Sequence, residues 1–119
     1  MRLCVGLIGC GSIGTVIAEA IDGGRVGDVE LVAVYDVIRE HAERLVSKLS
    51  RKPVISESVE GLIKREDIKL VVEAASQEAV RQYALKILDE GKDLMVMSTG
   101  ALLDDKLYKQ ILDSAKKRG

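Results

Sequence analysis

Aromatic residues are scarce in this chain of 119 residues, which has three tyrosines and neither phenylalanine nor tryptophan. Its core must therefore be built from leucine, isoleucine, valine and alanine. Such an aliphatic core is typical of parallel β-strands covered by helices. The length predicts one domain, residues 1–119, and leaves no room for a second, catalytic domain.

An excess of charge of either sign is also missing. The 18 basic and 19 acidic residues are interspersed and give a net charge of −1, so nothing indicates a nucleic-acid or membrane surface. No apolar run has the length of a transmembrane helix. The chain enters its first strand without the separate apolar segment and cleavage site of a signal peptide. We therefore expect a cytoplasmic protein without nucleic-acid or membrane partners.

Cysteine and histidine, which are common metal ligands, are rare as well. Cys4 and Cys10 lie roughly 20 Å apart if the segment between them is extended, which is too far for a disulfide. Two free thiols without metal-ligand spacing predict no metal site and fit a reducing cytoplasm. We interpret Cys10 as a small residue that fills a gap in a motif, rather than as a thiolate. The single histidine, His41, is interpreted as an exposed surface residue and not as a general base.

Glycine, by contrast, is concentrated directly after the first predicted strand, residues 2–8. Gly9, Gly11 and Gly14 have the spacing G-x-G-x-x-G and precede a helical pattern. The first glycine allows a tight turn, the second lets a pyrophosphate approach the backbone, and the third lets the helix pack closely on the strand. The free N–H groups and the positive end of the helix dipole then face the phosphate oxygens. This spacing also occurs in ordinary turns, but its position between strand and helix favours a dinucleotide site.

Asp36 follows the second predicted strand, residues 30–35, at the distance expected for a ribose-binding carboxylate. A carboxylate there can accept hydrogen bonds from both ribose hydroxyls and repels a 2′-phosphate, which favours NAD. The alternative is a solvated aspartate that begins the next turn. A nearby guanidinium, that of Arg39, could instead hold a 2′-phosphate and permit NADP.

Two later strands, predicted at residues 68–72 and 94–97, end in small and hydroxyl-bearing residues. In a doubly wound sheet the first of them lies beside strand 2–8, at the point where the strand order reverses and ligands bind. The two alanines after it would let a nicotinamide ribose approach. Ser76 either caps the next helix or contacts the cofactor, and the segment Ser98 to Gly100 either touches the nicotinamide or forms an ordinary turn.

Five predicted strands, including a short one at residues 54–55, alternate with helices. This pattern predicts an α/β fold, a Rossmann-type doubly wound parallel sheet with helices on both faces. Helices are expected to follow Gly11 and to cover residues 39–49, 56–63, 77–90 and 104–118. No catalytic or metal-ligating residue is assigned. The predicted cofactor-binding residues are Gly9, Cys10, Gly11, Ser12, Ile13, Gly14, Asp36, Val37, Arg39, Ala74, Ala75, Ser76, Ser98, Thr99 and Gly100.

Four segments together resemble the N-terminal, dinucleotide-binding half of the archaeal and bacterial L-aspartate dehydrogenases. They are Gly-Cys-Gly-Ser-Ile-Gly at residues 9–14, Asp-Val at 36–37, Val-Glu-Ala-Ala-Ser-Gln at 72–77 with Ala79, Val80 and Tyr83 after it, and Ser-Thr-Gly-Ala-Leu at 98–102. The first segment is shared with many dehydrogenases, whereas the last two are more specific. The related sugar oxidoreductases have Glu-Lys-Pro where this chain has Ser-Thr-Gly, which argues against that family.

The resemblance implies reversible oxidative deamination of L-aspartate to oxaloacetate and ammonia through an imine, with NAD or NADP as hydride acceptor and a role in NAD biosynthesis. In that family a second half supplies the substrate pocket, a catalytic histidine and much of the homodimer interface. No residue here matches that histidine. We therefore expect this chain to bind the dinucleotide without being catalytically competent alone, and to form a homodimer only with the second half.

Two alternatives remain open at this point. One is the cofactor domain of a homoserine dehydrogenase or dihydrodipicolinate reductase, which share the fold and part of the motif. The other is a regulatory nucleotide-sensing domain of similar length. Such domains typically carry a Gly-Asp pair after the third strand, where this chain has Ile55-Ser56-Glu57-Ser58.

Overall fold

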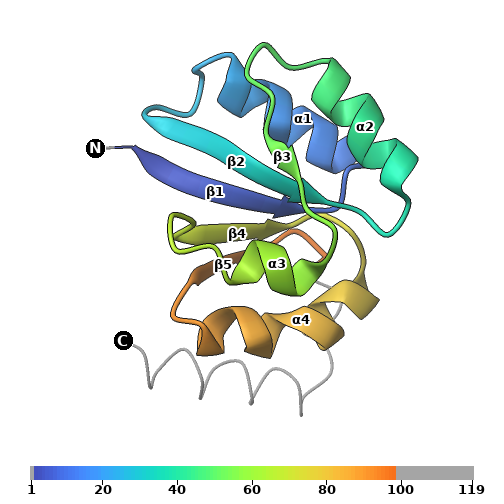
Figure 1. The fold of residues 1–119 in the computed structure, drawn as a ribbon, viewed down its shortest axis with the longest axis vertical. Coiled ribbons are helices and arrows are strands. Elements are labelled where there is room, and N and C mark those ends of the chain that lie inside the picture. The colour runs from blue at the N-terminus through green and yellow to red at the C-terminus, as the bar shows by residue number, and fades with distance from the viewer. Residues whose placement is uncertain (1, 99–119) are drawn as a thin grey trace.

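The computed structural model describes residues 2–98 and shows a five-stranded sheet between two layers of helices (Figure 1). The strand order is β3-β2-β1-β4-β5, and all four neighbouring pairs are parallel. This confirms the doubly wound parallel sheet. The helix expected at 104–118 lies outside the described residues. The elements are β1 (Leu3–Ile8), α1 (Ser12–Asp22), β2 (Val29–Tyr35), α2 (Arg39–Ser47), β3 (Val54–Ile55), α3 (Val59–Ile63), β4 (Leu70–Glu73), α4 (Gln77–Asp89) and β5 (Asp93–Val96).

The central strand β1 is buried on both faces because helices cover each side of the sheet. Val5 and Leu7 pack into one cluster with residues of α1 and α2, such as Leu45. Ile8 points to the other face and joins residues of α3 and α4, such as Ile87. Figure 1 shows the two helix pairs on opposite sides of the sheet. Each fully buried aliphatic side chain of this kind contributes about 2 kcal/mol, so the continuous apolar run of β1 fixes its central place.

The buried face of α1 contains most of the expected residues. The helical spacing of Ile13, Ile17, Ala20 and Ile21 predicts the packing stripe, and Ile17 and Ile21 do pack against the core. Ile13, however, is 54% exposed, and Gly14 and Ala18 are the fully buried residues of the helix. Gly14 lets the first turn of the helix lie against the backbone of Gly9, where a Cβ would not fit.

The start of α3 also differs from the expected position. This helix begins at Val59 rather than near residue 56, because Ser58 caps it by accepting a hydrogen bond from the N–H of Gly61 at 3.0 Å. An N-cap residue has extended backbone angles, and this ends the preceding loop at residue 58. Among residues 2–98, no helix is long and apolar enough to cross a membrane.

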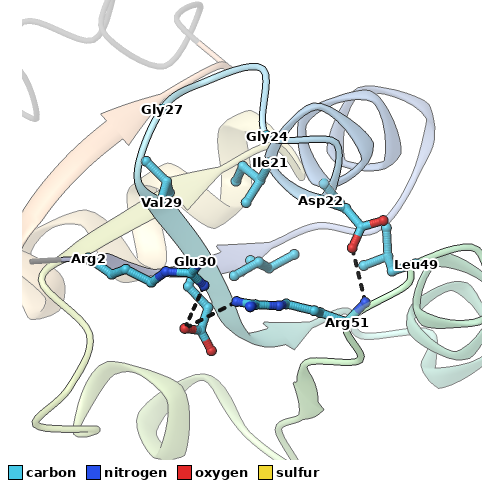
Figure 2. A pocket seen from close by; sticks show the side chains of 11 residues that line it. Arg2, Ile21, Asp22, Gly24, Gly27, Val29, Glu30, Leu49 and Arg51 are labelled. Atoms are coloured by element: carbon cyan, nitrogen blue, oxygen red, sulfur yellow. Dashed lines mark hydrogen bonds and ion pairs between the residues drawn. The ribbon is translucent and has the colours of Figure 1, made fainter.

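A hollow of about 230 Å³ lies at the amino-terminal edge of β2 (Figure 2). Figure 2 shows Arg2 and Arg51 both reaching Glu30, at 3.4 and 3.9 Å. Asp22 accepts a hydrogen bond from the backbone N–H of Arg51 at 3.0 Å. The charged groups of this hollow therefore pair with one another. The functional candidate is a larger cleft at the opposite edge.

Candidate functional site

A cleft of about 510 Å³ lies at the carboxyl ends of β1, β2 and β4. In a doubly wound sheet this is the edge where the strand order reverses and ligands bind. Seven of the residues expected to bind cofactor line the cleft: Gly9, Gly11, Asp36, Val37, Ala74, Ala75 and Ser76. Cys10, Ser12, Ile13 and Gly14 belong to the same turn and to the first turn of α1. Thr99 and Gly100 lie outside the described residues.

The three glycines of the turn have different structural roles. Gly9 has a φ of +103°, and a Cβ there would lie 2.6 Å from the backbone nitrogen of Ala75. A Cβ on Gly14 would collide with the carbonyl oxygen of Gly9. At Gly11, however, a Cβ would meet no atom within 4 Å. The chain itself thus requires glycine at 9 and 14, whereas the free space beside Gly11 is a cradle that a ligand can fill.

The amino end of α1 lies at this cradle without a side-chain cap. Gly11 occupies the N-cap position, and among the described residues no side chain bonds to the helix start and no acidic residue lies in its first turn. The N–H groups and positive dipole end of an uncapped helix attract an anion. The start of α4 differs, because Ser76 accepts a hydrogen bond from Ala79 N–H at 3.0 Å and Glu78 lies in its first turn. Of these two helix starts, that of α1 is therefore the one left without a capping side chain or an acidic residue in its first turn.

Asp36 connects the turn after β1 with the end of β2. Its side chain is only 12% exposed. One carboxylate oxygen, Oδ2, accepts a hydrogen bond from Cys10 N–H at 2.8 Å, and Oδ1 accepts one from Ile38 N–H at 2.8 Å. A carboxylate oxygen can accept a second hydrogen bond. Asp36 therefore holds the glycine turn and still has acceptor capacity on the wall of the cleft.

Cys10 is a buried thiol behind the turn. Its Sγ lies 3.7 Å from the carbonyl oxygen of Tyr35. Burial, together with the negative charge of Asp36, raises the pKa of this thiol to about 12. A thiol with so high a pKa stays protonated and unreactive at neutral pH. The burial and the raised pKa support the interpretation of Cys10 as a small residue that fills a gap, rather than as a thiolate.

Arg39 and His41, both on α2, lie differently from expectation. The Arg39 guanidinium pairs with Glu57 at 2.9 Å and with Glu43 at 3.7 Å, and it is not part of the cleft lining. His41 does line the cleft, with Nδ1 3.8 Å from Oδ1 of Asp36. His41 is partly exposed, with 38% of its side chain accessible, but the interpretation of it as a plain surface residue missed its place on the cleft wall. Because α2 begins directly after the end of β2, its first turn lies beside Asp36.

Two serines that were predicted to bind the cofactor, Ser76 and Ser98, lie in the loops after β4 and β5. Ser76 is the N-cap of α4, which supports capping over cofactor contact as its local role. Ser98 donates its hydroxyl to Oε2 of Glu73 at 2.8 Å and its backbone N–H to Oε1 at 2.9 Å. Ser98 is thus bound to a carboxylate of the chain itself rather than to the cleft surface.

The sequence interpretation assigned no role to Glu73, which ends β4 at the same edge of the sheet as the cleft. The side chain is 2% exposed and accepts five hydrogen bonds at distances between 2.8 and 3.2 Å. A signal was present, because a charged residue at the end of a strand buried on both faces must be paired. The donors are the backbone N–H groups of Ala75, Ser76, Met97 and Ser98 and the hydroxyl of Ser98.

Comparison with known families gives a match to the model described as the homoserine dehydrogenase NAD-binding domain, over residues 9–119. L-Aspartate dehydrogenase of Nitrosopumilus maritimus is 44% identical over 110 residues, and that of Methanocaldococcus jannaschii is 41% identical over 117. These alignments cover 92% and 98% of this chain but only 40% and 43% of the relatives. The chain therefore spans about two fifths of the length of these curated relatives.

Two solved structures show the same arrangement. Aspartate dehydrogenase from Thermotoga maritima has a TM-score of 0.72 and 28% identity, over 98% of this chain and 43% of that one. GenD2 from gentamicin A biosynthesis, solved in complex with NAD, has a TM-score of 0.86 over 99% of this chain and 32% of that one. At 21% identity, the second likeness shows the fold alone.

Proposed function

Because the chain belongs to the family of the homoserine dehydrogenase NAD-binding domain and is homologous to L-aspartate dehydrogenases, we propose that it is the cofactor-binding part of an NAD(P)-dependent L-aspartate dehydrogenase. The observation that carries the proposal is the open space beside Gly11, at the uncapped start of α1, with the Asp36 carboxylate at the end of the next strand. This combination offers one site for phosphate and one for a ribose.

In the proposed complex the pyrophosphate lies beside Gly11 and accepts hydrogen bonds from the first backbone N–H groups of α1. The hydroxyls of the adenosine ribose donate to Asp36. Val37, 78% exposed, and Ile38 beside it line the same cleft and offer an apolar surface to the adenine ring. The nicotinamide half then extends toward Ala74 and Ala75, where small side chains leave room for its ribose.

We propose NAD as the preferred cofactor, for two reasons. The negative charge of Asp36 repels the 2′-phosphate of NADP. Arg39, the candidate for holding that phosphate, is already paired with two glutamates and lies outside the cleft lining. Arg39 could bind the 2′-phosphate only if both of these ion pairs were broken.

The proposed reaction converts L-aspartate, NAD⁺ and water to oxaloacetate, ammonium, NADH and a proton, and the bound nicotinamide supplies the hydride acceptor. The described part of this chain would hold the dinucleotide and orient it. The aspartate site, the catalytic histidine and the homodimer interface are proposed to belong to the part of the relatives that this chain does not cover. A cytoplasmic location and a role in NAD biosynthesis are proposed by analogy with the family.

Calorimetric titration of the 119-residue chain with NADH and with NADPH tests the cofactor proposal. We expect NADH to bind more tightly. Asp36→Asn should weaken NADH binding by about tenfold or more, because hydrogen bonds to a charged acceptor contribute roughly 1.5–3 kcal/mol, and should reduce the preference over NADPH. Asp93→Asn is the matched control, since this exposed carboxylate lies at the amino end of β5, on the opposite edge. If the chain binds neither NADH nor NADPH, the proposal is overturned.

A chimera tests the role of the chain within a whole enzyme. Residues 1–119 would replace the matching segment of the M. jannaschii relative, with which they share 41% identity. We expect the chimera to form NADH in the presence of L-aspartate, and the isolated chain to form none. Turnover of aspartate by the isolated chain would contradict the proposed division between the two parts.

A further inference from the structure

Glu73 ends β4 with a buried carboxylate that joins two loops. The backbone N–H groups of Ala75 and Ser76 donate to its Oε2 at 2.8 and 2.9 Å, in the loop before α4. Those of Met97 and Ser98 donate to Oε1 at 3.2 and 2.9 Å, after β5. Four of the five donors are thus backbone N–H groups, which stabilise a carboxylate anion.

This carboxylate accepts hydrogen bonds from the two residues that directly precede α4, one of which, Ser76, is the N-cap of the helix. Ala75 and Ser76, which donate to Glu73, also line the cleft. The Glu73 carboxylate therefore lies behind the cleft wall on the β4 side, hydrogen-bonded directly to two residues that form the wall.

The side chains that line the described cleft add no permanent positive charge beside this carboxylate. Among the described residues that line it, Asp36 and Glu78 are acidic, His41 is the one titratable nitrogen base, and no lysine or arginine is present. A buried charge is also screened less by salt than an exposed one. The β4 side of the cleft therefore lies in a field that favours a cation.

We infer that Glu73 is a specificity-determining residue for the oxidation state of the cofactor, since its charge stabilises the cationic nicotinamide ring of NAD⁺ relative to the uncharged ring of NADH. This inference rests on the proposed function, which brings the nicotinamide half to the β4 side. Glu73 acts through the field and through the two loops that it joins, and it makes no contact with the reacting atoms.

The test is the ratio of the Kd values of NAD⁺ and NADH, measured by calorimetry on the 119-residue chain. Wild type should bind NAD⁺ at least as tightly as NADH. In Glu73→Gln the Kd of NAD⁺ should rise relative to that of NADH by roughly threefold or more, because a unit charge within several ångströms acts through protein rather than bulk water. A purely structural role would weaken both nucleotides equally and leave the ratio unchanged.

Three further variants separate charge from packing. Glu73→Asp keeps the charge but loosens the loops, and Ser98→Ala removes one hydrogen bond from the carboxylate, so both should keep the wild-type ratio. Glu66→Gln removes an exposed carboxylate beyond the amino end of β4 and should leave both Kd values unchanged. If Glu73→Gln does not fold, the test uses the Kd ratios of wild type and Glu73→Asp. The inference is overturned if wild type clearly prefers NADH. It is also overturned if Glu73→Asp, which keeps the charge, does not keep the wild-type ratio.

The result also separates this inference from the proposed function. If the wild-type chain binds neither nucleotide, the proposed function fails. If it binds both and Glu73→Gln folds with an unchanged ratio, the inference alone fails.

Discussion

The backbone N–H of Cys10 donates a hydrogen bond to Oδ2 of Asp36 at 2.8 Å, across 26 residues of sequence. This bond ties the glycine turn that faces the phosphate site to the carboxylate that faces the ribose site. Displacement of either group would therefore move the other. The phosphate and ribose halves of the cleft form one unit, and substitutions in it are expected to act on both.

Gly11→Val should abolish NADH binding while leaving the fold intact. A Cβ at this position meets no atom of the chain within 4 Å, and the backbone angles of Gly11 are in the extended region. The free energy of unfolding in urea should therefore change by less than about 1 kcal/mol. Calorimetry should detect no NADH binding, because the new side chain fills the space proposed for the pyrophosphate. Normal binding by this variant would argue against that space as the phosphate site.

Gly9→Ala should have the opposite outcome and destabilise the fold. The residue has a φ of +103°, and a Cβ would lie 2.6 Å from the backbone of Ala74 and Ala75. Strain and a contact with rigid backbone together should cost about 2–4 kcal/mol. Urea unfolding of Gly9→Ala beside Gly11→Ala measures the difference. Equal stability of the two variants would show that the turn is less constrained than its geometry indicates.

The thiol of Cys10 should make stability fall at high pH. Its pKa is raised from an ordinary value of 9.0 to about 12 in the folded chain. Above pH 9 the thiol ionises in the unfolded state and not in the folded one. Its contribution to the free energy of unfolding is therefore complete below pH 9 and is lost as the pH rises toward 12. Between pH 9 and 10 the loss is about 1 kcal/mol.

The measurement for this prediction is the free energy of urea unfolding between pH 8 and 10, with Cys10→Ala as the control. The variant should show a flatter decline, because the group responsible is gone. In native wild type, alkylation of Cys10 at pH 8 should be slow compared with alkylation in urea. A steep decline that persists in Cys10→Ala would assign the effect to other groups, such as Tyr35, whose pKa burial also raises.

Arg39 and His41 should differ in their effect on cofactor preference. Arg39→Ala should leave the ratio of the NADH and NADPH affinities within about twofold, because the guanidinium pairs with exposed glutamates. His41→Arg should raise the NADPH affinity, since it places a permanent cation beside Asp36, where a 2′-phosphate would lie. Calorimetry with both nucleotides checks each variant. A large change in Arg39→Ala with none in His41→Arg would restore Arg39 as the determinant.

The sequence predicted the parts of this molecule that depend on neighbours along the chain. The apolar runs predicted the strands, and glycine spacing predicted a turn whose first and third glycines the structure confirms as sterically required. Asp36 and the residues after β4 were placed correctly on one edge because parallel strands all end there. The short-range signals therefore sufficed for the sheet and for much of the cleft lining.

The features that were missed depend on contacts between distant segments. Glu73 binds Ser98 across 25 residues, and nothing local to either residue indicates the other. The place of His41 depends on how α2 returns from the end of β2. Ile13 is exposed in a helix whose next residue, Gly14, lies against the backbone of Gly9, a contact that the apolar spacing does not reveal. In each case tertiary packing, and not local periodicity, decides the outcome.

The central place of β1 in the sheet has a consequence for the order in which the molecule assembles. β1 pairs with β2 from Leu3 opposite Val29, and with β4 from Val5 opposite Leu70. Closing the second, longer loop costs roughly 1 kcal/mol more conformational entropy than closing the first. We expect β1, α1 and β2 to nucleate folding. The turn that receives phosphate and the carboxylate that receives ribose would then form early, and the side proposed to receive nicotinamide would be completed last.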